Sequence, residues 1–130
     1  MTEVPSPEAA LARARQTLLA AEALLREGYV PDAVSRAYYA GLYAALALLA
    51  SIGLSPKTHE GVRTLVNLHF VRTGKLQGGT GRLLTHLEGD REDADYDLAA
   101  VFSPEDGRGI LDEATLFVQQ AAQVLEKAPS

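Results

Sequence analysis

The sequence predicts an all-α protein, built as an up-and-down antiparallel bundle of four to five helices. In most segments apolar residues recur at steps of three and four positions, which is the period of one helix face. Pro and Gly divide the chain into segments of helical length, and no segment alternates at a period of two for long enough to form a strand. We therefore expect the 130 residues to form a single helical domain, with frayed ends at 1–5 and 128–130.

The first helix is expected to begin at Ser6, a favourable cap, with Pro7 in the first helical position and the acid Glu8 in the first turn. Its apolar stripe repeats at helical spacing: Leu11, Ala14, Leu18, Ala21 and Leu25. Gly28 ends this helix. A tight connection over 29–32 leads into the next one.

The second helix, over 35–54, is predicted to be the centre of the bundle. From Ala37 to Leu54 its 18 residues carry no charge, so it is apolar around nearly its whole circumference. Such a helix must be surrounded by protein or by lipid, and its length reaches the lower limit for a membrane span. Three tyrosines lie at one end only, and the flanking amphipathic helices need a partner for their apolar stripes. We therefore expect a bundle core that ends at Gly53, and no membrane association.

The third helix is expected to start with either Ser55 or Thr58 as its cap and to stop at Gly74. One side of it is apolar, formed by Val62, Leu65, Val66, His69 and Phe70. The Gly-rich segment 76–81 that follows is expected to be the most flexible part of the chain.

The fourth helix is expected to carry Leu83, Leu84 and Leu87, and to bend or break at Gly89 before continuing over 91–98. The segment 103–106, Ser-Pro-Glu-Asp, repeats the start signal of the first helix. A long last helix follows, with the stripe Ile110, Ala114, Phe117, Val118, Ala121 and Leu125.

The charge balance gives no general attraction to nucleic acid, because the net charge is −5. Locally, residues 54–87 have a balance of +4 and residues 88–113 a balance of −8. Solvated helix faces are the favoured explanation. The alternative is a basic surface for a polyanion beside an acidic surface for a second partner. The absence of cysteine and of an apolar leader at the N-terminus predicts a cytoplasmic protein.

Searches for catalytic and metal motifs mostly fail. The segment 59–63, His-Glu-Gly-Val-Arg, has Arg where a zinc-binding helix needs its second His. The segment 78–82 could offer free amides to a phosphate, but it lacks the ending of a P-loop and fits a flexible turn better. We expect no metal, no cofactor and no nucleophile of the usual hydrolase patterns.

The second helix presents Arg36, Tyr39 and Tyr43 on one face. A guanidinium that opens an otherwise uncharged helix is expected to be partly buried and to need an acidic or phosphate partner. The favoured hypothesis is a structural ion pair of Arg36 with Asp95 or Asp97. The alternative is that Arg36, the tyrosines and Arg91 line a cleft for a nucleotide or RNA phosphate.

Four blocks of the sequence together resemble the HEPN domain family, in its small stand-alone prokaryotic branch. They are Ser-Arg-Ala-Tyr-Tyr-Ala-x-Leu-Tyr-Ala-Ala at 35–45, Lys-Thr-His-x-Gly-Val at 57–62, Phe-Val-x-Thr-Gly-x-Leu at 70–76 and Arg-x-x-Ala-Asp-Tyr-Asp at 91–97. Their order and spacing agree with the family over most of the chain. The resemblance implies a four- to five-helix bundle that forms a homodimer, often encoded beside a minimal nucleotidyltransferase.

The resemblance also implies that some such pairs act as toxin and antitoxin. The HEPN protein is then a metal-independent ribonuclease that uses an Arg-x4-6-His motif on a late helix. Here the block has Arg91 and Tyr96, but no His at the required spacing. Asp95 is acceptor-only when ionised and cannot donate a proton as imidazolium can. Two other pairs with similar spacing, Arg63 with His69 and Arg82 with His86, are attributed to chance.

The sequence thus favours a non-catalytic binding module, a homodimer that engages a nucleotidyltransferase partner, a nucleotide or RNA. We expect its cleft to include Arg36, Tyr39, Tyr43, Lys57, His59, Arg91, Asp95 and Tyr96. No residue is assigned a catalytic role. The alternative is an active, metal-independent endoribonuclease toxin.

Overall fold

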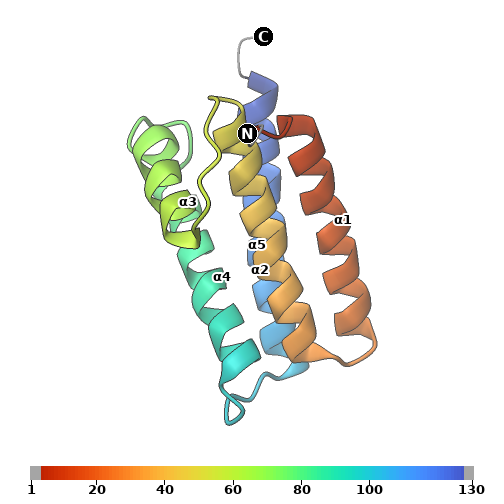
Figure 1. The fold of residues 1–130 in the computed structure, drawn as a ribbon. Coiled ribbons are helices and arrows are strands. Elements are labelled where there is room, and N and C mark those ends of the chain that lie inside the picture. Colours follow the sequence, from red (N-terminus) through yellow and green to blue (C-terminus); the bar gives the residue numbers. More distant parts are fainter. Residues whose placement is uncertain (1–3, 128–130) are drawn as a thin grey trace.

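The computed structural model describes residues 4–127, and within this range it contains helices and no strand (Figure 1). The elements are α1 (Pro7–Arg26), α2 (Val30–Ala50), α3 (His59–Val66), a single π-helical turn η1 (Asn67–Val71), α4 (Gly78–Tyr96) and α5 (Pro104–Lys127). Of the ends predicted to fray, residues 1–3 and 128–130 lie outside the described range, and residues 4 and 5 are exposed and non-helical.

The prediction of an up-and-down helical bundle is confirmed. In Figure 1 the chain descends in α1, rises in α2, descends in α4 and rises in α5, while α3 and η1 lie beside the upper part of α4. α2 is the central element and contacts all four of the other α-helices. Only the parts of α2 that these neighbours leave uncovered can therefore contact other molecules.

The apolar α2 is buried by protein, as its composition predicts. Fourteen of its 21 residues are buried. It is long and apolar enough to cross a membrane, but 72% of its most apolar window is buried inside the bundle. Gly41 allows α4 to come close, since a Cβ there would lie 3.2 Å from the Leu87 Cδ1 atom. This close approach brings the next turn of α4, which carries Arg91, against the tyrosines of α2.

Side-chain caps fix where the helices start. Ser6 Oγ accepts a hydrogen bond from the Ala9 amide (3.0 Å), as the Ser-Pro-Glu signal predicts. Thr58, and not Ser55, caps α3, because its Oγ1 accepts from the Gly61 amide at 2.9 Å. At the start of α5, Ser103 and Asp106 exchange two hydrogen bonds of 2.9 and 3.0 Å in a capping box.

Two expectations for α4 are wrong. The helix begins at Gly78, inside the segment predicted to be flexible, and it continues through Gly89 without interruption. Thr80 is buried and Gly81 lies so close to Val71 that a Cβ would be 2.7 Å from its Cγ2 atom. Packing against η1 therefore outweighs the low helix propensity of glycine, which costs about 1 kcal/mol per residue.

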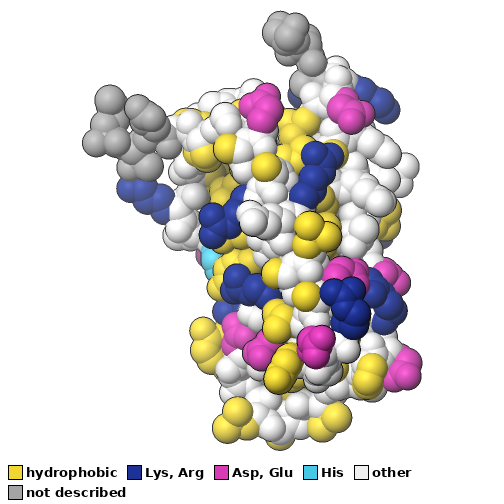
Figure 2. Space-filling model, turned by 90° about the vertical axis from the view of Figure 1, so that its right-hand side faces the viewer, with side chains coloured by type: hydrophobic (Ala, Val, Ile, Leu, Met, Phe, Trp, Pro, Cys, Tyr) yellow, Lys and Arg dark blue, Asp and Glu magenta, His cyan; other side chains and the backbone are white. Residues whose placement is uncertain are grey.

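Ion pairs join different helices of the bundle. Arg63 of α3 contacts Glu88 of α4, and Arg108 of α5 forms a two-pronged pair with Glu22 of α1. Figure 2 shows the α1 side of the molecule, where acidic and basic side chains are interspersed with hydrophobic ones and no charge of one sign covers the face. The Arg63–Glu88 pair joins the basic run 54–87 to the acidic run 88–113.

Candidate functional site

Arg91 is the centre of the candidate site. Only 8% of its surface is exposed, although it is a charged residue. Its Nη1 lies 3.5 Å from Asp95 Oδ2 one turn later on α4, and its Nε is buried without a hydrogen-bond partner among residues 4–127. Its guanidinium carbon lies 5.4 Å from the centre of the Tyr38 ring, 6.0 Å from that of Tyr39 and 5.7 Å from that of Tyr96.

This environment keeps Arg91 charged. Burial alone would lower the pKa of its guanidinium, but interactions with Tyr39, Tyr96 and Asp95 outweigh burial, so that the pKa is raised above its usual value. Within residues 4–127 the only carboxylate partner of Arg91 is the partly exposed Asp95, so this fixed positive charge retains part of its attraction for a second anion.

A row of alternating cations and aromatic rings runs along α2 from this point. The Arg36 guanidinium carbon lies 4.7 Å from the centre of the Tyr39 ring, and the Tyr39 and Tyr43 rings are 6.5 Å apart. Arg13, from the neighbouring α1, lies 5.4 Å from the centre of the Tyr43 ring. Both rings are half-buried, so each still presents surface to solvent.

His59, the first residue of α3, reaches the same tyrosines as Arg91. Its ring centre lies 5.5 Å from that of Tyr38 and 6.4 Å from that of Tyr39. Tyr38 itself is 1% exposed, and burial raises the pKa of its phenol to about 12. Tyr38 is therefore neutral, and Arg91 of α4 and His59 of α3 both lie against its ring.

The structure thus brings together seven of the eight residues expected in the cleft. Arg36, Tyr39, Tyr43, His59, Arg91, Asp95 and Tyr96 form one connected set with Tyr38, which we call the tyrosine–arginine cluster. Lys57 is exposed in the loop before α3, and within residues 4–127 it forms no hydrogen bond, ion pair or cation–π contact with the cluster. Tyr96 is 75% exposed and lies at the outer edge.

The predicted ion pair of Arg36 with Asp95 or Asp97 is wrong. Asp95 instead accepts a 3.4 Å hydrogen bond from Ser35 Oγ and pairs with Arg91, while Asp97 accepts from the Ala99 amide at 3.0 Å. Arg36 forms no ion pair with any residue of 4–127 and lies over an aromatic ring. The acidic turn does meet a buried guanidinium, but it comes from α4 itself.

Sequence reasoning missed three residues near the cluster: Ser35, Tyr38 and Arg13. It also missed the burial of Arg91, for which a signal exists. The buried residues of α4 are Thr80, Leu84, Leu87 and Arg91, at steps of four, three and four. Arg91 continues the inward stripe, so the helical period alone places its guanidinium inside. No local signal identifies Arg13, because its position depends on how α1 packs on α2.

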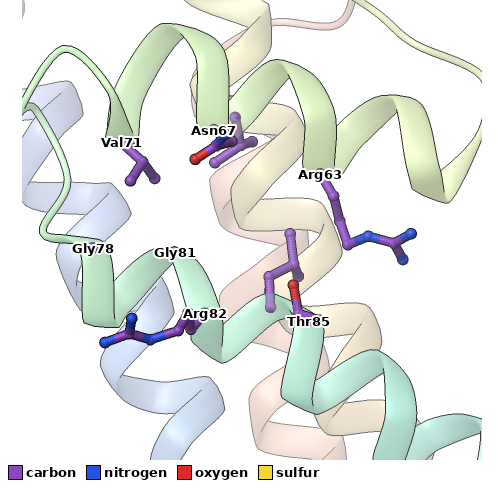
Figure 3. Close-up of a pocket in the computed structure, with 9 residues that line it drawn as sticks. Arg63, Asn67, Val71, Gly78, Gly81, Arg82 and Thr85 are labelled. Carbon is purple, nitrogen blue, oxygen red and sulfur yellow. The ribbon is translucent and has the colours of Figure 1, made fainter.

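The other two Arg–His pairs form no site of this kind. Arg63 is engaged by Glu88, and His86 Nδ1 lies 3.8 Å from a carboxylate oxygen of Glu113. Figure 3 shows a pocket of about 160 Å³ between α3, η1 and α4, with Arg63 and Arg82 extending away from each other at its two ends. Arg63 and Arg82 therefore do not converge on one point, and their geometry gives no support to phosphate binding by the Gly-rich segment. A second pocket, of about 560 Å³, lies between η1 and the ends of α2 and α5.

Comparison with known proteins agrees with the arrangement of these blocks. The model of the HEPN domain matches residues 7–125, which span all the helices described above. The chain is a member of the HEPN domain family. The resemblance of the four sequence blocks is thereby confirmed, and in this HEPN protein three of those blocks supply the tyrosine–arginine cluster.

Relatives extend over most of the chain. A Methanocaldococcus jannaschii protein named "Putative toxin MJ0605" is 36% identical over 114 residues, 88% of this chain and 84% of its own length. A UPF0332 protein of Thermotoga maritima is 33% identical over 88% of this chain and 86% of its own. A UPF0332 protein of Gloeobacter violaceus is 34% identical over 93% and 97%, respectively.

Proposed function

We propose that this HEPN protein is a homodimeric binding module whose tyrosine–arginine cluster receives a phosphate of a nucleotide or of RNA. The observation that carries the proposal is the buried guanidinium of Arg91, whose Nε has no hydrogen-bond partner, and which has one carboxylate partner, among the residues that the structure describes. Arg36 and His59 add hydrogen-bond donors beside Tyr39, the ring that Arg91 also approaches. A planar guanidinium among aromatic rings suits a ligand with a phosphate and a base.

Binding without catalysis is favoured because no His follows Arg91 at the family spacing. Asp95 stands one turn after Arg91, where its side chain forms an ion pair with Arg91 and accepts a hydrogen bond from Ser35 Oγ. The residues that remain can hold and orient a phosphodiester. In this proposal the protein contributes a surface that binds RNA or a nucleotide, and no catalytic group, to a complex with its partner.

Fluorescence anisotropy with a labelled single-stranded RNA tests the binding role. We expect Arg36→Ala and Arg91→Lys each to weaken binding by at least about fivefold, since a charge-assisted hydrogen bond contributes about 1.5–3 kcal/mol. Arg91→Lys keeps the charge and removes the planar fork. The matched control is Arg72→Ala, which removes an exposed guanidinium at the far end of the α3–η1 unit. Equal effects of the control and the site variants would contradict the proposal.

Dimer formation is proposed through the connection between α4 and α5, next to Arg91. Three apolar side chains there are among the most exposed of the described chain: Tyr96 at 75%, Leu98 at 99% and Val101 at 88%. Exposed apolar groups of this kind mark interaction surfaces. Sedimentation at micromolar concentration should give a dimer, and the double variant Leu98→Ser/Val101→Ser should sediment as a monomer. A wild-type monomer would remove this part of the proposal.

A minimal nucleotidyltransferase is proposed as the protein partner, on the basis of the family alone. The first check is whether the neighbouring reading frame encodes a Gly-Ser-x10-Asp-x-Asp pattern. The second is co-expression of the two proteins, with co-elution as the expected result. Separate elution of the two proteins would exclude a stable complex.

The second candidate function is a metal-independent endoribonuclease toxin. Relatives that are named toxins favour it, as does the position of His59, an imidazole that faces the same tyrosines as Arg91. Incubation of RNA with the protein and a chelator tests this candidate. Cleavage that is lost in Arg91→Lys and in His59→Gln, but kept in His86→Ala, would replace the binding module by an enzyme.

A further inference from the structure

The row on α2 repeats one unit, an aromatic ring with a guanidinium over it. The first unit is Tyr39 with Arg36 at 4.7 Å, and the second is Tyr43 with Arg13 at 5.4 Å. The two rings lie one helical turn apart, 6.5 Å between centres and inclined by 37°. Because the second unit borrows its cation from α1, it exists only in the folded bundle.

We propose that this row is a binding track for two successive nucleotides of a single strand, with Arg13 as a second phosphate contact. The inference rests on the proposed function and assigns its ligand class. In a stacked strand successive bases are separated by about 3.4 Å. The 6.5 Å between the rings is larger, so two neighbouring bases would separate from each other and each lie against its own tyrosine unit.

The shape of the surface favours a strand over a mononucleotide. The rings are half-buried, and Arg13 is exposed whereas Arg91 is buried. The row therefore starts at an enclosed cation and opens outward along α2, which fits a strand that enters at one end and continues into solvent. A duplex, with its bases already stacked and paired, would present no free base to either ring.

Labelled oligouridylates of one, two, four and eight nucleotides test the track. We expect the affinity of the wild-type protein to rise at least about fivefold from one to two nucleotides, since each base stacked on an aromatic ring contributes about 1–3 kcal/mol. Arg13→Ala should weaken binding of the dinucleotide by threefold or more and leave the mononucleotide unaffected. It should also reduce the salt slope by about 0.7, the value for one phosphate contact on a single strand.

The matched control is Arg15→Ala, which removes an exposed guanidinium from the same helix but from a different face. Tyr43→Leu provides a second variant that removes the ring, with its thermal unfolding midpoint recorded to confirm the fold. If Arg13→Ala and Tyr43→Leu bind like the control while Arg36→Ala and Arg91→Lys still bind weakly, the track is refuted and the phosphate site stands. If the wild type binds no oligonucleotide, both fail.

Discussion

Replacing Arg91 by Ala is expected to lower the free energy of unfolding by about 2–4 kcal/mol. The guanidinium lies within 5.4–6.0 Å of three ring centres, and each such contact contributes about 0.5–2 kcal/mol depending on its exposure. The pair with Asp95 adds about 1 kcal/mol at most, because the Asp95 side chain is 31% exposed and stays hydrated when its partner is removed. The cost therefore stays near or below the 3–5 kcal/mol of breaking a fully buried pair.

Arg36→Ala is the matched control for this change. It also removes one guanidinium, but one that is half-buried, lies over a single ring and has no ion pair within residues 4–127. We expect its cost to be under about 1 kcal/mol. Urea unfolding measures both variants, at one protein concentration because any dimer couples stability to concentration. Equal costs, or a larger cost for Arg36→Ala, would refute the assignment of Arg91 as the buried cation.

Three further changes test the packing and the charges. Burial and neighbouring carboxylates raise the pKa of Asp90, so Asp90→Asn should stabilise the protein at pH 7, and the gain should vanish near pH 3, where the carboxyl is protonated in both states. The pKa of Tyr38 is raised from 10.0 to about 12, so stability should fall as pH rises through this window, and Tyr38→Phe should reduce that fall in alkaline urea titrations. A Cβ at Gly107 would lie 2.7 Å from Leu25 Cδ1, whereas one at Gly109 meets nothing within 4 Å. Gly107→Ala should therefore have the lower melting temperature of the two, and the reverse order would contradict this packing.

The helix ends could be predicted where a glycine follows the apolar stripe, but the start of α2 could not, because residues 30–32, expected in the connection, already form its first turn. Gly28, Gly53 and Gly74 have positive φ values of 80–89° and each lies just beyond the end of a helix or helical turn, as predicted. Gly89 and the glycines of 78–81 look the same in sequence but lie inside α4. What distinguishes the two groups is the contact of α4 with α2 and η1, and this is tertiary information that no local pattern contains.

The proximity of these residues in the fold could largely be predicted, but their pairing could not. A guanidinium near an uncharged helix needs a partner, and two arginines, Arg36 and Arg91, lie beside the tyrosines of α2. Arg91 is the buried one of the two, because it continues the buried stripe of α4 and lies over the Tyr38 ring. Arg36 is half-buried and lies over the face of Tyr39, without an ion pair to any residue of 4–127. Which of two cations faces inward depends on the rotation of a helix about its axis, and only the period of its own stripe reveals it.

Arg91 either joins α4 to the tyrosines or binds a phosphate, and the substitution Asp95→Asn beside it distinguishes these two roles. The substitution removes the negative charge beside Arg91 and keeps an oxygen that can accept from Ser35 and from the guanidinium. If Arg91 only joins α4 to the tyrosines, the unfolding free energy falls by up to about 1 kcal/mol and RNA binding does not change.

If Arg91 receives a phosphate, the same substitution removes a competing anion, and RNA affinity should rise by about threefold or more while stability falls. A gain in RNA affinity together with a loss of stability is expected when the same residues serve both binding and folding. Anisotropy and urea unfolding on the same protein samples measure both quantities. A loss of stability without any gain in affinity would leave the cluster with a structural role only, and a gain in affinity that persists in Arg91→Lys/Asp95→Asn would assign the receptor to another cation.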